Sequence, residues 1–142
     1  MRQIFLVLFM SIAVAACSTP PEKLTNFEDQ SMRRFDNIKL SIEEVQMDIR
    51  QAAAKTGWEV EPGVLPGHIK ATHKGEDKAK AVVDIAYDVN KYSISYKSSE
   101  KMGYMDSCKS SKSGSIEHNC IDPKYNAWVT ELNDAISHEL QD

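Results

Sequence analysis

The spacing of hydrophobic residues changes several times along the chain, and each period predicts a different element. From residue 41 to residue 56, apolar side chains recur every three or four positions, which is the period of one helix face. Ser41 and Glu44 form the pattern of an N-terminal capping box. Gly57 suits the C-terminal cap because glycine tolerates a left-handed conformation. We therefore predict a helix over residues 41–56.

Beyond this helix the period shortens to two residues. Apolar and polar side chains alternate in four short runs, at residues 58–61, 68–73, 79–88 and 92–97. Such alternation is typical of strands that have one buried and one solvated face. The short polar connections between the runs favour an antiparallel meander.

A second helix is predicted at the C-terminal end, after a long polar segment at residues 99–121. Asp122 and Pro123 supply an N-cap acceptor and a proline at the first helical position. An apolar stripe follows at helical spacing: Tyr125, Trp128, Val129, Leu132, Ile136 and Leu140. The order α-β-β-β-β-α predicts an α+β two-layer sandwich over residues 36–142, a four-stranded antiparallel meander with two helices on one face.

The N-terminal residues predict export. Arg2 precedes an apolar run at residues 4–16, which is shorter than the ~20 residues of a membrane-spanning helix and is typical of a signal peptide. Val14–Cys17 resembles the lipobox of bacterial lipoproteins. The resemblance implies cleavage after residue 16, a diacylglycerol on Cys17 and, because Ser18 rather than aspartate follows, the periplasmic face of the outer membrane. A plain secretory signal with an unmodified Cys17 is the alternative.

The residues that follow predict a tether. Residues 17–35 would comprise the lipidated cysteine and a flexible linker, since they are largely polar, contain adjacent prolines and show no period. The chain would then divide into a signal peptide at 1–16, this tether, and a single domain at 36–142. The acyl chains would supply membrane affinity, at about 0.8 kcal/mol for each buried methylene.

Charge and cysteine content narrow the function classes. The sequence has 17 basic and 21 acidic residues, a formal net charge of −4, which argues against a general nucleic-acid binder. With Cys17 assigned to lipid, Cys108 and Cys120 remain, and the oxidising envelope favours a disulfide between them. Closing this loop would contribute about 3 kcal/mol. The alternative, a metal site with His118, lacks a CxxC spacing and a second histidine nearby, so we predict no metal.

The sequence offers few candidate catalytic residues. The sequence contains no glycine-rich phosphate loop, zinc signature or cofactor motif, so we predict no cofactor and no catalytic residue. His68 and His73 lie five residues apart on one predicted strand, and their side chains should point to opposite faces. Asp84 and Asp88 share a strand face, but acid–base catalysis would need a cleft, and a solvated face is the simpler interpretation.

Four lysines form a local basic patch in this acidic protein: Lys97, Lys101, Lys109 and Lys112. Together with His118 they are the predicted partner-binding residues, toward a protein, anionic lipid or lipopolysaccharide phosphate. The alternative is a solvated, serine-rich loop with no partner.

Several motifs together resemble those of a group of small, mostly uncharacterised lipoproteins of Gram-negative bacteria. They stand at residues 57–58, 66–71, 81–88, 92–96, Ser99, Tyr104, 116–118 and 125–129. The resemblance implies an envelope location and an α+β fold, but no established activity. The chain departs from the pattern in the turn at residues 74–80, where an arginine and a histidine are expected, and in its extra segment between the two later cysteines.

These features predict a lipid-anchored periplasmic interaction module that supports envelope assembly or maintenance. Its partner would be a periplasmic or outer-membrane protein. The alternative is a periplasmic binder of a small apolar or glycan ligand between sheet and helices. An enzyme is the third class, and it lacks an identifiable site.

The variant Cys17→Ala tests the anchor. Because one thiol is expected to carry the diacylglycerol, the variant should move from the membrane fraction to the soluble fraction and lose incorporation of labelled palmitate. Ser18→Ala is the matched control and should remain with the membranes. A Cys17→Ala protein that still sediments with membranes and keeps its acyl label contradicts the prediction.

Overall fold

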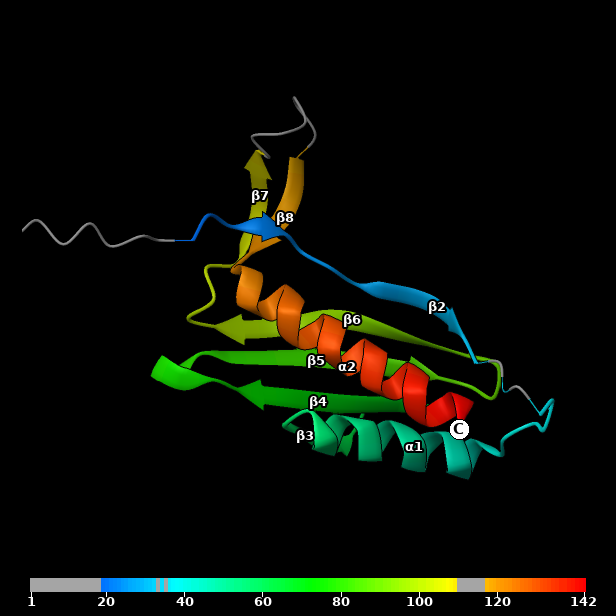
Figure 1. Cartoon of the computed structure of the whole chain (residues 1–142). Coiled ribbons are helices and arrows are strands. Elements are labelled where there is room, and N and C mark those ends of the chain that lie inside the picture. Colours follow the sequence, from blue (N-terminus) through cyan, green and yellow to red (C-terminus); the bar gives the residue numbers. More distant parts are fainter. Residues whose placement is uncertain (1–18, 33, 35, 110–116) are drawn as a thin grey trace, which may run out of the picture.

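The computed structural model describes residues 19–32, 34, 36–109 and 117–142. Its elements in chain order are β1 (Glu22–Lys23), β2 (Phe27–Ser31), α1 (Ile42–Lys55), β3 (Trp58–Pro62), β4 (His68–Lys74), the 3-10 helix η1 (Glu76–Lys78), β5 (Lys80–Tyr87), β6 (Lys91–Glu100), β7 (Met105–Lys109), β8 (Glu117–Ile121) and α2 (Pro123–Gln141). They form a five-stranded antiparallel sheet in the order β2-β6-β5-β4-β3 and a three-stranded antiparallel sheet in the order β1-β8-β7 (Figure 1).

Both predicted helices are confirmed, together with their N-terminal caps. At the start of α1, Ser41 Oγ accepts a hydrogen bond from the backbone N–H of Glu44 at 3.2 Å, and Glu44 Oε2 accepts one from the backbone N–H of Ser41 at 2.7 Å. At the start of α2, Asp122 Oδ1 accepts from the backbone N–H of Lys124 at 2.8 Å. Among the described residues, no helix combines the length and the apolar character that crossing a bilayer requires.

The two helices pack on one face of the five-stranded sheet (Figure 1). The predicted alternation brings a set of fully buried side chains to that face: Ile69, Ala71, Val83, Ile85 and Ile94. They belong to one core with Val45, Ile49, Leu132 and Ile136 from the helices. Burying each large aliphatic side chain contributes about 1.5–3 kcal/mol, so this layer interface is the main source of stability. The predicted α+β sandwich is therefore confirmed at the level of its layers.

The single four-stranded meander is wrong, because the sheet has a fifth strand and the chain builds a second sheet. β2 pairs with β6 across a bulge, with Phe27 opposite Ile94 and Gln30 opposite Tyr92. Four of its five residues are polar, so hydrophobic alternation does not reveal it. β7 and β8 lie in the segment expected to be a polar loop, and their pairing depends on backbone hydrogen bonds rather than on an apolar pattern.

The N-terminal segment, residues 19–32, lies along the domain (Figure 1). Residues 22–31, which the sequence places in the tether, contain β1 and β2. Further backbone hydrogen bonds hold the segment at both ends. The N–H of Leu24 donates to the carbonyl of Asn119 at 2.8 Å, and the N–H of Met32 donates to the carbonyl of Asn90 at 2.9 Å. The folded part of the chain therefore begins before residue 36.

Amide hydrogen exchange tests whether this segment is docked in solution. The N–H groups of Leu24 and Met32 should exchange much more slowly than an unstructured amide, because each donates to a backbone carbonyl of a distant strand or turn. The amide of Leu65, in an exposed turn, serves as the reference. Random-coil exchange rates at both positions would show a free linker instead.

Candidate functional site

Exposed hydrophobic side chains gather at one end of the sandwich, which we call the turn end. The turns at residues 63–67 and 88–90 lie there, because β4 begins where β3 ends and its first residue pairs beside the end of β5. The start of α1 lies at the same end of the sheet (Figure 1). Five of the seven exposed large hydrophobic residues in the described chain belong to this end: Ile38 (64%), Ile42 (39%), Val64 (90%), Leu65 (61%) and Val89 (43%).

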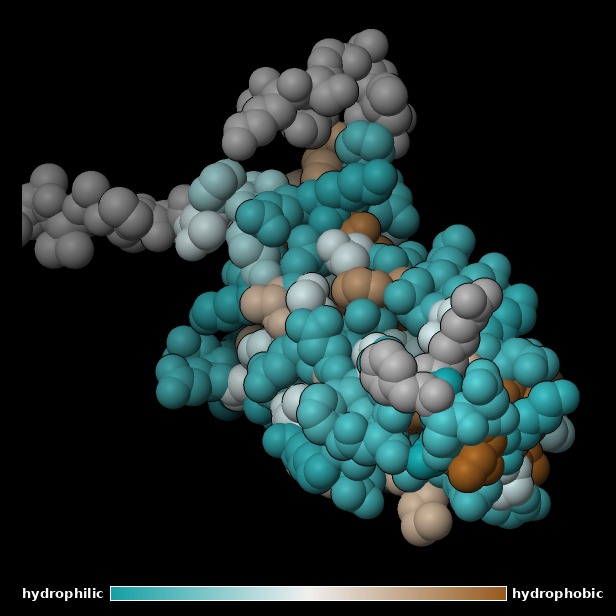
Figure 2. Space-filling view, turned by 45° about the vertical axis from the view of Figure 1, so that its right-hand side comes forward, coloured by the Kyte–Doolittle hydropathy of each residue, from teal (hydrophilic) through white to brown (hydrophobic). Residues whose placement is uncertain are grey.

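Figure 2 brings the turn end forward and shows brown, hydrophobic surface at its lower right. A hollow of about 250 Å³ opens at this end, with Met32, Ile38, Leu40 and Val89 among its walls. Arg34 forms a polar part of the wall of this hollow. Its Nη2 donates to the backbone carbonyl of the last residue at 2.8 Å, which ties the segment before α1 to the end of α2.

The outer face of the five-stranded sheet carries ion pairs between neighbouring strands. They are Glu61–Lys70 at 2.8 Å, Glu59–Lys74 at 3.0 Å, Lys80–Glu100 at 2.7 Å and Asp29–Lys91 at 2.7 Å. Most of these side chains are well exposed, and exposed pairs contribute little stability each. The alternation of charge keeps this face hydrophilic, as the sequence predicted for the solvated side of the strands.

A histidine–carboxylate pair also lies on this outer face. His68 Nδ1 and Asp84 Oδ2 are 2.7 Å apart, and both side chains are partly exposed. A hollow of about 280 Å³ lies beside them, with Ser93 in its wall. The Ser93 hydroxyl accepts from the backbone N–H of Asp29 at 3.0 Å, and no hydroxyl in the described part of the chain hydrogen-bonds to His68. The geometry therefore supports a surface hydrogen-bonded pair rather than an activated nucleophile.

His73 lies on the opposite face of β4, as the sequence predicted. Its ring stacks on Trp128 at a centroid distance of 4.2 Å and meets Trp58 edge-on at 5.1 Å. Gly75 lies directly under the same indole, because a Cβ there would come within 2.6 Å of Trp128. Burial lowers the pKa of His73, and nearby Glu131 opposes this shift in part. This cluster around His73 lies between the sheet and α2, at the end of the sandwich opposite the turn end.

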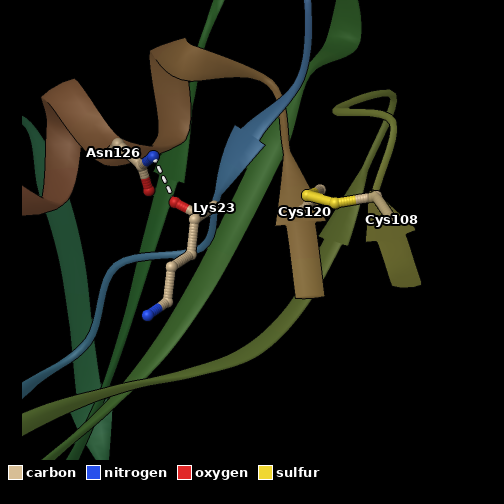
Figure 3. The surroundings of a disulfide bond; sticks show 4 residues. All are labelled: Lys23, Cys108, Cys120 and Asn126. Atoms are coloured by element: carbon tan, nitrogen blue, oxygen red, sulfur yellow. Dashed lines mark hydrogen bonds between the residues drawn. A yellow bond between two sulfur atoms is a disulfide. The ribbon is translucent and has the colours of Figure 1, made fainter. Parts of the chain in front are cut away.

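The two later cysteines lie in neighbouring strands of the small sheet (Figure 3). Cys108 and Cys120 are bonded through sulfur with their Cα atoms 5.9 Å apart, which fits the predicted disulfide. β8, which carries Cys120, also pairs with β1, where Lys23 lies opposite Cys120. The disulfide therefore braces the strand on which the N-terminal segment docks.

Asn126 on α2 holds the N-terminal segment by its backbone (Figure 3). Its Nδ2 donates to the carbonyl of Lys23 at 2.8 Å, and its Oδ1 accepts from the N–H of Thr25 at 3.0 Å. One side-chain amide thus binds a carbonyl and an N–H on the same short stretch of chain. Sequence reasoning missed this role, since a lone asparagine on a polar helix face gives no signal of its own.

The structure describes four of the five predicted partner-binding residues, each on or beside a strand. Lys97 is exposed on β6 and Lys101 is exposed just after it, while half-buried His118 on β8 lies opposite Cys108. Lys109 ends β7. Lys112 and Cys17 lie outside the described residues, so their predictions stay predictions.

Beside Lys101, a hollow of about 310 Å³ is lined also by Thr19, Pro21 and Met105. It lies at the beginning of the described chain, next to the small sheet. Because the predicted lipidation site, Cys17, precedes it in sequence, we call this the anchor end, defined by Thr19, Pro21, Lys101, Met105 and Asp122.

Comparison of the chain with models of protein families, with curated proteins and with solved structures gives no match. Within the described residues, no group of three or more histidine, cysteine, aspartate or glutamate side chains is placed to hold a metal ion. The function is therefore argued from the geometry of the turn end, the anchor end and the N-terminal segment.

The stability of the His73 cluster should depend on pH. In the unfolded chain the imidazole protonates near pH 6.5, whereas the folded protein lowers its pKa. The free energy of unfolding should therefore be highest above about pH 6.5 and fall as the pH drops through and below that value.

Urea titrations of the native protein and His73→Phe at pH 7.5 and 5.5 measure this effect. The variant should lose part of the decrease between the two pH values, because it removes the titrating group but keeps an aromatic ring. His138→Gln, at an exposed position, is the control and should retain the native pH dependence. Equal decreases in the native protein and His73→Phe would contradict the assignment.

Proposed function

We propose that this protein is a lipid-anchored periplasmic interaction module that binds another envelope protein through its turn end and so supports envelope assembly or maintenance. The observation that carries the proposal is that five of the seven exposed large hydrophobic side chains in the described chain lie at that end. Exposed hydrophobic residues scattered singly need no explanation, but a gathered set marks an interaction surface. Burying such side chains against a partner yields roughly 25 cal/mol per Å² of apolar area.

The most exposed members of the set stand on a structured turn. The N–H of Gly63 donates to the carbonyl of His68 at 2.9 Å, and the N–H of Tyr87 donates to the carbonyl of Gly67 at 2.9 Å. Gly67 adopts a φ of 73°, which glycine accepts without strain. Val64 and Leu65 are thus presented by a turn that is closed before a partner arrives, which reduces the entropy lost on binding.

The position of the turn end supports a protein partner. The described chain starts at the anchor end, close in sequence to Cys17, and the turn end lies at the other end of the large sheet (Figure 1). A domain anchored through Cys17 would therefore present the turn end toward the periplasm. The space between the sheet and the helices is filled by fully buried side chains, which favours this function over a ligand held between the layers.

A photo-crosslinking amino acid at position 65 tests the proposal in intact cells. We expect one discrete adduct with a single envelope protein, identified by mass and then shown to bind in purified form. Val64→Asp in the same chain should weaken capture about tenfold or more, because a buried unpaired charge costs at least ~1.4 kcal/mol. Its stability should stay native, since Val64 is exposed.

The matched control carries the crosslinker at position 130, an exposed site on α2. Equal capture from positions 65 and 130, or capture that Val64→Asp leaves unchanged, overturns the proposal. An adduct between two copies of this chain overturns it in favour of self-association.

A further inference from the structure

We infer that the anchor end rests on the phospholipid surface, with Lys101 among the headgroup phosphates and Met105 at the boundary of the acyl chains. The inference rests on the lipid anchor of the proposed function and adds the orientation of the domain. It follows from how little free chain separates Cys17 from the folded domain. The anchor end would thus contact the same membrane leaflet that holds the acyl chains.

The first step is the length of the free chain. β1 begins at Glu22, so only residues 18–21 lie between Cys17 and the first strand. Five steps of extended chain span at most about 18 Å. Two of the four intervening residues are Pro20 and Pro21, which favour an extended and stiff conformation. An acylated Cys17 would therefore keep Glu22 within about 18 Å of the membrane surface.

The second step is that several interactions hold β1 on the domain. Glu22 pairs with Ile121 and Lys23 pairs with Cys120 on β8, which the disulfide joins to β7. Asn126 holds the carbonyl of Lys23 and the N–H of Thr25. The N–H of Leu24 donates to the carbonyl of Asn119. The segment is thus bound on two sides, by β8 and by α2.

The third step is the chemistry of the surface within that reach. Met105 is one of the two exposed large hydrophobic residues in the described chain that lie away from the turn end. It shares a hollow with Thr19, Pro21 and Lys101. Lys101 is exposed, and so is Lys97 on the preceding strand. A thioether beside ammonium groups matches the boundary between acyl chains and anionic phosphates.

Two carboxylates near Lys101, those of Glu100 and Asp122, already have partners. Glu100 forms an ion pair with Lys80 at 2.7 Å. Asp122 caps α2 by accepting from the backbone N–H of Lys124. Neither carboxylate is therefore the partner that neutralises the charge of Lys101. An acidic protein can in this way present a locally basic contact to an anionic bilayer.

The orientation also determines the distance between the turn end and the membrane surface. β6 has 10 residues and runs from Lys91 at the turn end to Glu100 beside Lys101. A strand of that length spans about 30 Å. The hydrophobic cluster of the turn end would then be held about 30 Å from the lipid contact, within reach of proteins in the periplasm.

The test uses the mature lipidated protein in vesicles of phosphatidylethanolamine and phosphatidylglycerol whose acyl chains are brominated. Met105→Trp and Val64→Trp place an indole at the anchor end and at the turn end, both at exposed positions. The signal of the native tryptophans is subtracted with the unsubstituted protein. We expect bromolipid to quench the indole at position 105 several-fold more than the indole at position 64.

Two further variants separate the causes. Asn126→Ala should reduce the quenching at position 105 toward that at position 64, because the segment can then peel off. Lys101→Glu should reduce it in the anionic vesicles and leave it unchanged in vesicles of phosphatidylcholine alone. Flotation of every variant with the vesicles reports the anchor independently.

Protein that floats but shows equal quenching at both positions overturns the orientation and leaves the anchor intact. Protein that fails to float overturns the anchor, and the orientation with it. Neither result bears on the crosslinking from the turn end, which therefore tests the partner surface separately.

Discussion

The side-chain amide of Asn126 is the interaction on which the docking of the N-terminal segment depends. It donates to the carbonyl of Lys23 and accepts from the N–H of Thr25, so it binds the backbone of the N-terminal segment much as a neighbouring strand would. β1 has only two residues, and a pair of that length does not hold by itself. The Asn126 amide, the pairing of β1 with β8 and the disulfide between β8 and β7 act together. Each of them restricts the conformations of the segment, so less conformational entropy is left for the others to remove.

The two ends of the molecule differ in their chemistry. At the anchor end the described part of the chain starts beside exposed lysines, the small sheet and a solvent-exposed methionine. At the turn end, hydrophobic side chains stand on closed turns and around the hollow that Arg34 borders. The core between the helices and the large sheet is rigid enough to hold the ends apart. In the proposed lipid-anchored state, one end contacts the bilayer and the other is left for a protein.

The sequence predicts the parts of this fold that are encoded in local patterns. The capping box at Ser41, the proline after Asp122 and the alternation in the central strands each depend on neighbouring residues, and each predicted element is present. β2 escapes prediction because Phe27 is its only apolar residue, and its place is fixed by the strand that it joins. The pairing of two cysteines could be predicted because only two remained once Cys17 was assigned to lipid.

The candidate sites depend on register and could not be predicted in the same way. His68 meets Asp84 only because His68 lies opposite Ala86, two residues along β5. The turn end gathers Ile38, Val64 and Val89 from three connections that are far apart in sequence. The hydrogen bonds of Asn126 join residues about 100 positions apart in sequence, so no local sequence pattern predicts them.

Neutron reflectometry of the protein in its proposed lipidated form, on a supported bilayer, tests the central claim most directly, since it measures where the protein lies relative to the headgroups. A docked N-terminal segment predicts a compact protein layer that begins at the headgroups, with a gap no wider than about 18 Å. The Asn126→Ala variant should broaden that layer, because more of the chain before α1 can then extend. A diffuse layer that already spreads tens of ångströms into the solvent for the native protein, as a free linker over residues 18–35 would give, contradicts the account.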